Sequence, residues 1–390
     1  MAQPKAVRAA ATAAAVVPDI AAQLDLASAC INGAGSMMAA PAAVGRPPLV
    51  VIGHRGKGMN SLASPDERLR EVKENSVRSF NDAARVAGVG YVEFDVQVTK
   101  DGCPIVFHDN FIFTEQDGKI SEKRITDLPL DEFVSYGPQK DRDKLGRPLL
   151  RKLKDGRILR WDVRSDDPLC TLREAFEDVD RRVGFNVELK FDDDLVYQEE
   201  ELAGVLQAIL KVLFEHAKDR PVIFSSFQPD AALLMRKLQD QYPVYFLTVG
   251  GTQLHADARR NSLEEAVRLC RAGGLQGIVS EARAVFRHPS AVARVKEADL
   301  SLLTYGQLNN VPEAVYMQHL MGVDGVIVDL VQEIAEAVSG FAGVVAPEPS
   351  PEEGQAGRLG LDTAALAKKT PNLSQREISF LLRLIPELVQ

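Results

Sequence analysis

Eight short apolar segments recur between residues 49 and 329, and they constrain the fold more than any other feature of the sequence. Each is rich in Val, Ile, Leu and Phe almost throughout, as expected for parallel strands buried on both faces. Helical patterns separate most of them. Eight strand-then-helix units favour a closed α/β barrel, the (β/α)8 or TIM barrel, although an open doubly wound sheet shares the alternation. The expected strands are 49–53, 91–96, 185–190, 222–227, 244–248, 276–280, 300–305 and 325–329.

The helical patterns have recognisable ends. Asn75 and Ser76 are suited to cap a helix that runs to about Ala87 and stops at Gly88. Between residues 110 and 170 the alternation gives way to charged sequence with Gly and Pro, which we interpret as an insertion after the second strand. The other expected helices are 197–215, 229–240, 261–272, 289–297 and 312–320.

The two ends of the chain differ from the region between them. Residues 1–46 are alanine-rich with few acids, which fits either an organelle transit peptide or a disordered tail. Residues 47–340 are expected to form the barrel domain. Residues 341–390 begin as a Pro- and Glu-rich linker and end in an apolar segment, 378–389. We interpret that segment as a helix docked on the barrel, with a partner-binding or membrane-surface helix as the alternative.

Composition narrows the class of protein and the kind of metal site. The net charge of −9 and the sequence pI near 5.4 give no general attraction for nucleic acid, which needs clustered Lys and Arg. The four cysteines form no CxxC spacing, and no apolar run reaches the roughly 18 residues that span a bilayer. We therefore expect any metal site to use oxygen ligands, with or without histidine.

Polar residues cluster where the first three expected strands end. The first strand runs into His54 and Arg55, the second carries Glu93 and Asp95, and the third carries Glu188 and ends in Lys190. Residues two apart in a strand share a face, so each pair on the second and third strands points the same way. In a TIM barrel, the carboxyl ends of the strands form the active-site mouth.

A hairpin is predicted directly after the second strand. Asp101-Gly102 lies between two alternating apolar runs, which is a strong hairpin signal. A two-residue turn there would pair Lys100 with Cys103 and would place Asp95 opposite His108. The hairpin would thus fold His108 back beside the carboxylates.

These residue types point to phosphodiester chemistry. Three converging carboxylates repel one another unless a cation neutralises them, and Mg²⁺ or Ca²⁺ prefers such oxygen ligands. His54 and His108 would suit a general acid and a general base, and Arg55 and Lys190 would hold an anion. Taken singly, each residue has a structural alternative; it is their combination at one mouth that favours catalysis.

The other polar residues carry weaker signals. Phe227 and Tyr305, at the ends of the fourth and seventh strands, are expected to shape an apolar wall of the substrate pocket. The acidic run 192–194 closely follows the third strand and is interpreted as a solvated loop, with contact to the site as the alternative. His216, His255, His288 and His319 are interpreted as surface or packing residues.

Six short motifs, in this order and spacing, resemble those of the glycerophosphodiester phosphodiesterase family, and several longer stretches are similar to its plant, plastid-type members. The match extends across roughly residues 49 to 340. The motifs are Gly53-His54-Arg55-Gly56, Glu74-Asn75-Ser76, Glu93-Phe94-Asp95-Val96, Thr99-Lys100-Asp101-Gly102, Val106-Phe107-His108-Asp109 and Val187-Glu188-Leu189-Lys190.

The resemblance implies a TIM barrel that hydrolyses glycerophosphodiesters, the deacylated phospholipids, to sn-glycerol 3-phosphate and an alcohol. It implies that the glycerol 2-hydroxyl attacks phosphorus and that the resulting cyclic phosphate is then hydrolysed. The implied roles are metal binding for Glu93, Asp95 and Glu188, acid–base catalysis for His54 and His108, phosphate binding for Arg55 and Lys190, and orientation of Arg55 or of the metal shell for Glu74.

Two other functions remain open from the sequence. One is a phospholipase C- or D-like phosphodiesterase that acts on intact or lyso-lipids, and the other is a non-catalytic binding barrel. The resemblance makes a plastid location an expectation, with the cytoplasm as the alternative. The sequence leaves open the choice of Mg²⁺ or Ca²⁺, the head group and the oligomeric state.

Overall fold

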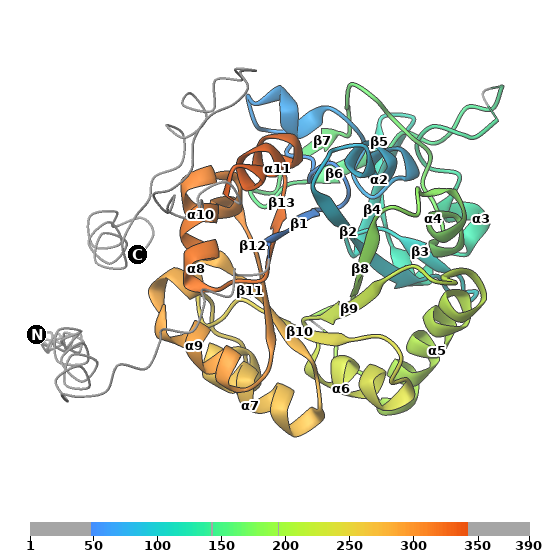
Figure 1. The fold of residues 1–390 in the computed structure, drawn as a ribbon. Helices are drawn as coiled ribbons and strands as arrows, with labels where there is room; N and C mark the ends of the chain where they lie inside the picture. Colours follow the sequence, from blue (N-terminus) through green and yellow to red (C-terminus); the bar gives the residue numbers. More distant parts are fainter. Residues whose placement is uncertain (1–47, 142, 194, 342–390) are drawn as a thin grey trace, which may run out of the picture. The chain divides into compact units, whose positions relative to one another are not determined.

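The computed structural model describes residues 48–341 except 142 and 194. Eight parallel strands close into a barrel, because β1 pairs with β13 on one side and with β2 on the other, and helices surround it (Figure 1). The predicted TIM barrel is confirmed, and its strands lie close to their predicted bounds. They are β1 Val50–Gly53, β2 Val89–Val98, β8 Gly184–Leu189, β9 Val222–Ser226, β10 Val244–Thr248, β11 Gly277–Glu281, β12 Ser301–Tyr305 and β13 Gly325–Val328.

The helices pack their apolar sides on the outer face of the barrel. Ser76 caps the first of them as predicted, since its hydroxyl accepts a hydrogen bond from the Ser79 amide. That helix ends at Ala84 rather than Ala87, because the chain turns through Gly88, at φ +89°, to enter β2. The helices are α2 Val77–Ala84, α4 Leu172–Asp178, α5 Glu199–His216, α6 Pro229–Leu238, α7 Leu263–Gly273, α8 Ala282–Arg287, α9 Ser290–Glu297, α10 Pro312–Met321 and α11 Val331–Ser339.

The insertion after β2 forms a small antiparallel sheet in the order β5-β4-β6-β7. It has its own apolar core, in which Phe107 packs edge-on against Phe133 and at a tilt against Trp161. The elements are β4 Phe111–Gln116, β5 Lys119–Arg124, α3 Leu130–Phe133, β6 Leu150–Lys152 and β7 Ile158–Arg160.

The hairpin after β2 exists, but its predicted register is wrong by one residue. Val96 pairs with Val106 and Val98 with Pro104, in β3 (Pro104–Val106), so the loop has three residues rather than two. The third is Gly102 at φ +81°, as in a hairpin with a bulged turn. A one-residue slip reverses the faces of a strand, so a continued ladder would point His108 away from the carboxylates. The strand ends at Val106 instead, and the chain turns to bring His108 back.

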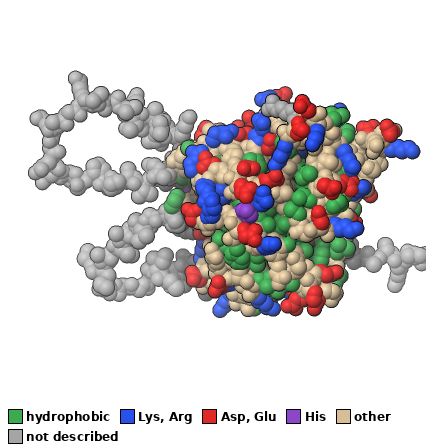
Figure 2. Space-filling view, turned by 90° about the vertical axis from the view of Figure 1, so that its right-hand side faces the viewer, with side chains coloured by type: hydrophobic (Ala, Val, Ile, Leu, Met, Phe, Trp, Pro, Cys, Tyr) green, Lys and Arg blue, Asp and Glu red, His purple; other side chains and the backbone are tan. Residues whose placement is uncertain are grey.

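The predicted extensions, residues 1–46 and the segment 378–389, lie outside the described residues. Within the described part, no helix combines the length and the hydropathy needed to cross a bilayer. On the side of the molecule shown in Figure 2, cationic and anionic side chains are interspersed and do not form a large patch of one sign.

Candidate active site

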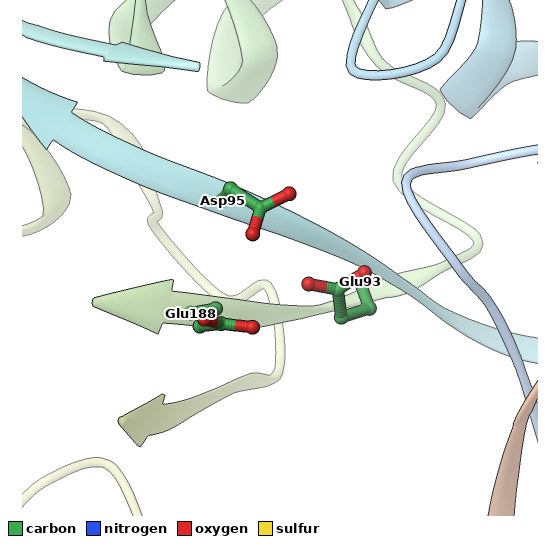
Figure 3. A group of neighbouring side chains, drawn as sticks. All are labelled: Glu93, Asp95 and Glu188. Atoms are coloured by element: carbon green, nitrogen blue, oxygen red, sulfur yellow. The ribbon is translucent and has the colours of Figure 1, made fainter. Parts of the chain in front are cut away.

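Three buried carboxylates meet at the mouth of the barrel. Glu93 and Asp95 project from β2, and Glu188 projects from the neighbouring β8, where it pairs in register with Asp95 (Figure 3). Oxygens of all three lie within 4.8 Å of one another. The alternation of β2 explains the arrangement, because Phe94 between the two acids packs outward against Phe80 and Phe185.

The electrostatics of the three carboxylates fit a divalent cation. Burial, and then the charge of Asp95, raises the pKa of Glu93, and burial likewise raises the pKa of Glu188. Burial would also raise the pKa of Asp95, but the nearby His108, Arg55 and Lys190 lower it overall. A cluster of oxygen donors that resists carrying its full negative charge is suited to Mg²⁺ or Ca²⁺.

We expect cation binding to release protons near neutral pH. A carboxyl group must be deprotonated to bind a metal, so affinity should increase as the pH rises through the raised pKa of Glu93 and then level off. Calorimetric titration of Mg²⁺ or Ca²⁺ in two buffers with different ionisation enthalpies counts these protons. Identical heats in both buffers at neutral pH would contradict the expectation.

Arg55, in the loop after β1, contacts Glu93 and Asp95 of the triad and also Glu74, which precedes α2. Its amide donates to Glu93 Oε2 at 3.0 Å, its Nη1 donates to Glu74 Oε1 at 2.7 Å, and its Nε lies 3.3 Å from Asp95 Oδ2. It has φ +51°, an uncommon conformation for a residue with a side chain. Such strain is held only where the surroundings fix it, as they do here.

Lys190 neutralises the opposite side of the triad. Its Nζ lies 2.9 Å from Glu188 Oε1 and 3.6 Å from Asp95 Oδ1. Burial opposes its charge, yet the two carboxylates raise the pKa of Lys190 overall. The side chain therefore stays cationic at the mouth, where an anion would approach.

His54 is held by Asp329, a residue that the sequence analysis missed. His54 Nδ1 lies 2.7 Å from Asp329 Oδ1, and Asp329 also accepts from the Met59 amide and from Asn310 Nδ2. Burial would lower the pKa of His54, but the Asp329 carboxylate raises it overall. The signal was present: Asp329 directly follows the eighth strand and therefore lies at the same mouth.

His108 is held by a second aspartate. Its Nδ1 lies 2.7 Å from Asp109 Oδ1, and that oxygen also accepts from Arg151 Nη2 at 2.9 Å. Arg151 comes from β6 of the inserted sheet, and its Nη1 donates to Glu74 Oε2 at 3.0 Å. Burial, and then the charges of Arg55 and Lys190, lowers the pKa of His108 well below its usual value.

Arg151 thus joins the His108–Asp109 pair to Glu74, which in turn binds Arg55. Burial would raise the pKa of Glu74, but Arg151 and Arg55 together lower it to about 2. Arg151 also lies over the Trp161 ring, 4.3 Å from its centroid. Sequence reasoning missed this residue because nothing in an irregular insertion indicates which of its arginines turns inward.

Replacing Arg151 by Met is expected to lower kcat by roughly 10- to 100-fold with little change in KM, because small displacements of positioned groups have effects of this order. The conservative Arg151→Lys variant should recover part of the rate. Arg160→Met, at an exposed arginine of the same inserted sheet, is the matched control and should behave as wild type. Steady-state kinetics on folded variants measure the effect. Equal kcat values for Arg151→Met and Arg160→Met would contradict the expectation.

The two predicted aromatic residues lie at the mouth, and Asp192 is buried there although its loop was predicted to be solvated. Phe227 and Tyr305 contact each other edge-on with centroids 6.1 Å apart. A cavity of about 420 Å³ is lined by Phe227 together with His108 and Glu188. The same cavity is lined by Asp192 and by His255, a partly exposed loop residue, as a surface or packing histidine can be. The loop after β8 folds inward because Arg124 of the insertion pairs with Asp192.

Comparisons with known proteins agree with this architecture. The sequence model of the glycerophosphoryl diester phosphodiesterase family matches residues 54–333. Glycerophosphodiester phosphodiesterase GDPD2 of Arabidopsis thaliana is 55% identical over 360 residues, covering 91% of this chain and 94% of that protein. Glycerophosphodiester phosphodiesterase GDPD1, chloroplastic, from the same plant is 56% identical over 342 residues, covering 87% and 90%.

Two solved structures support the fold alone. A glycerophosphodiester phosphodiesterase from Parabacteroides distasonis has a TM-score of 0.52 at 21% identity, covering 76% of this chain and 100% of that one. An Oleispira antarctica phosphodiesterase, solved in complex with the product sn-glycerol-3-phosphate, has a TM-score of 0.52 at 22% identity, covering 75% and 97%.

The fold and the family match together define a TIM-barrel phosphodiesterase. The family match across most of the barrel, and the relatives that are 55% and 56% identical over 91% and 87% of the chain, make the assignment specific. The chain belongs to the glycerophosphoryl diester phosphodiesterase family.

Proposed function

We propose that this protein hydrolyses glycerophosphodiesters to sn-glycerol 3-phosphate and an alcohol. The observation that carries the proposal is the placement of two aspartate-bound histidines and two cations around one buried carboxylate triad. The close relatives are named for the same activity. Glu93, Asp95 and Glu188 would hold Mg²⁺ or Ca²⁺, which when bound would supply Lewis-acid polarisation of the phosphate.

The residues of the chain account for binding and proton transfer. Arg55 and Lys190 hold the phosphate oxygens, and Glu74 keeps Arg55 oriented through the 2.7 Å hydrogen bond. Phe227 and Tyr305 form an apolar wall beside them. Asp329 and Asp109 orient the two imidazoles, as a third group orients the base in other acid–base sites.

The reaction requires one histidine as base and the other as acid. One imidazole takes the proton of the glycerol 2-hydroxyl while that oxygen bonds to phosphorus. The bond from phosphorus to the oxygen of the leaving alcohol breaks, and the other histidine donates a proton to this leaving oxygen. Water then opens the five-membered cyclic phosphate with the proton transfers reversed. The opposite pKa shifts of His54 and His108 suit one donor and one acceptor.

A diester that lacks the 2-hydroxyl tests this reaction. Phosphorus NMR of the reaction mixture should show cleavage of the parent diester but no cleavage of the 2-deoxy analogue under the same conditions. The cyclic phosphate should accumulate transiently from the parent. Comparable cleavage of the deoxy analogue would contradict attack by the 2-hydroxyl.

One observation favours a second candidate, hydrolysis of lysophospholipids. Leu254 is 84% exposed and lies between Gln253 and His255, which line the cavity at the mouth, and Val196 is 89% exposed in the loop after β8. Exposed aliphatic residues beside a site are suited to an acyl chain. Release of the head-group alcohol from lysophosphatidylcholine would support this activity. The Val196→Ser, Leu254→Ser double variant should lose this release and keep its glycerophosphodiester turnover.

For the location of the protein we propose the plastid, on the ground that one close relative is named chloroplastic. A fluorescent fusion of the full chain, compared with a fusion that starts at residue 47, tests this proposal.

A further inference from the structure

The cavity beside the triad extends past the catalytic groups. Besides His108, Glu188 and Lys190, its lining includes Phe227 after β9 and, in the connection after β10, His255 and Arg260. Its volume of about 420 Å³ is sufficient for a small polar group. If the phosphate binds at Arg55 and Lys190, one of the two alcohol arms of the diester would occupy the rest of the cavity.

The carboxylates that line the cavity are already paired with cations. Each therefore lacks a free negative charge for a cationic ligand such as a quaternary ammonium group. The pairs are Asp109 with Arg151, Glu188 with Lys190, Asp192 with Arg124 and Asp193 with Arg260.

Two residues that line the cavity, Arg260 and His255, each have a side-chain nitrogen with unused hydrogen-bonding capacity. Arg260 is 9% exposed and donates Nη1 and Nη2 to Asp193 at 2.7 and 3.1 Å, yet its buried Nε has no hydrogen-bond partner among the described residues. His255 Nε2 is likewise buried without such a partner in the described part of the chain. A buried unpaired polar group costs free energy, which a ligand hydroxyl would offset.

The loop that carries these groups is internally fixed. The side chain of Asn261 accepts from the His255 amide at 2.7 Å and donates to the His255 carbonyl at 2.8 Å. The Arg260 carbonyl accepts from Thr248 Oγ1 at 3.1 Å, at the end of β10. The guanidinium of Arg260 lies 5.9 Å from the centroid of Phe227, on the cavity wall. The nitrogen atoms are therefore held in place before a ligand arrives.

We propose that this cavity is the head-group subsite and that it selects hydroxylated alcohols, such as glycerol or inositol, over choline, with Arg260 as the specificity-determining residue. The inference rests on the proposed phosphodiesterase function. A hydroxyl accepts from Arg260 Nε and exchanges a hydrogen bond with His255 Nε2. A trimethylammonium group can do neither, because it has no hydrogen-bond donor or acceptor.

The test compares kcat/KM for glycerophosphoglycerol and glycerophosphocholine in the metal-loaded full chain. Wild type should favour glycerophosphoglycerol by about 10-fold or more, the value of a hydrogen bond to a charged group. Arg260→Gln should reduce that preference to near parity, through loss of activity on glycerophosphoglycerol. Arg259→Gln is the matched control, because Arg259 pairs with Asp230 and Asp257 and does not line the cavity, so the preference should persist.

Equal losses on both substrates in Arg260→Gln, or a wild-type preference for choline, would overturn the inference while leaving the proposed function intact. If Arg260→Gln does not fold, His255→Phe, at a partly exposed histidine, is the replacement variant. It should also lower the preference for glycerophosphoglycerol over glycerophosphocholine, and an unchanged preference would overturn the inference. Absence of turnover of either diester by folded wild type with Mg²⁺ and with Ca²⁺ would overturn the proposed function and this inference together.

Discussion

Alanine in place of His54 or His108 should lower kcat by at least about 100-fold, the usual contribution of a positioned acid or base. Each imidazole is oriented by an aspartate at 2.7 Å, Asp329 for one and Asp109 for the other. No other described histidine has this arrangement at the mouth, so we expect no replacement to act in their place. Steady-state kinetics with saturating metal measure the effect.

The control for the histidine variants is His216→Ala. His216 lies at the end of α5 and pairs with Glu177, away from the mouth, so its loss should leave kcat unchanged. The double variant that lacks both mouth histidines should be scarcely slower than the worse single variant if the two act as one unit. Near-normal turnover in either single variant would exclude the two-histidine assignment.

Glu188→Ala is expected to weaken Mg²⁺ or Ca²⁺ binding by at least about 10-fold, since even groups that only support metal ligands are worth that much. It should not unfold the barrel. Glu188 is one of three carboxylates that repel one another in the metal-free protein, so its removal relieves repulsion, and Lys190, which loses Glu188 as a partner, keeps Asp95 at 3.6 Å.

Two measurements separate binding from folding in this variant. Calorimetric titration gives the metal affinity, and thermal unfolding in chelator should give a melting temperature no lower than that of the wild type. Glu177→Ala, at a half-exposed glutamate of α4, is the control and should bind metal normally. An unchanged titration for Glu188→Ala would show that Glu188 is no ligand.

The sequence predicts the barrel and the triad because both depend on short-range periodicity. Strands buried on both faces are uniformly apolar, so polar residues such as Glu93 and Asp95 stand out in them. Their separation by two residues places them on one face without knowledge of the rest of the fold. The neighbouring Glu188 follows once the strands are known to be parallel.

Contacts between distant segments were not predictable in this way. Asp329 is 275 residues from His54, and only closure of the barrel brings them together. Arg151 reaches Asp109 from an inserted sheet whose strands are too short to show a period. The predicted hairpin register is wrong for a local reason: Asp-Gly fits a two-residue turn as well as it fits the three-residue loop that forms. His108 still reaches the mouth, but by a turn after β3 rather than by strand pairing.

The central claim is that the triad, the histidines and the cations form a single phosphodiester-cleaving site. The most direct test is the release of glycerol 3-phosphate from glycerophosphoglycerol and glycerophosphocholine by the purified full chain, with Mg²⁺, with Ca²⁺ and with chelator. We expect release with at least one of the metals and its loss in chelator, restored when metal is added back. Equal release in chelator would contradict the metal triad, and no release under any condition by folded protein would contradict the proposed function.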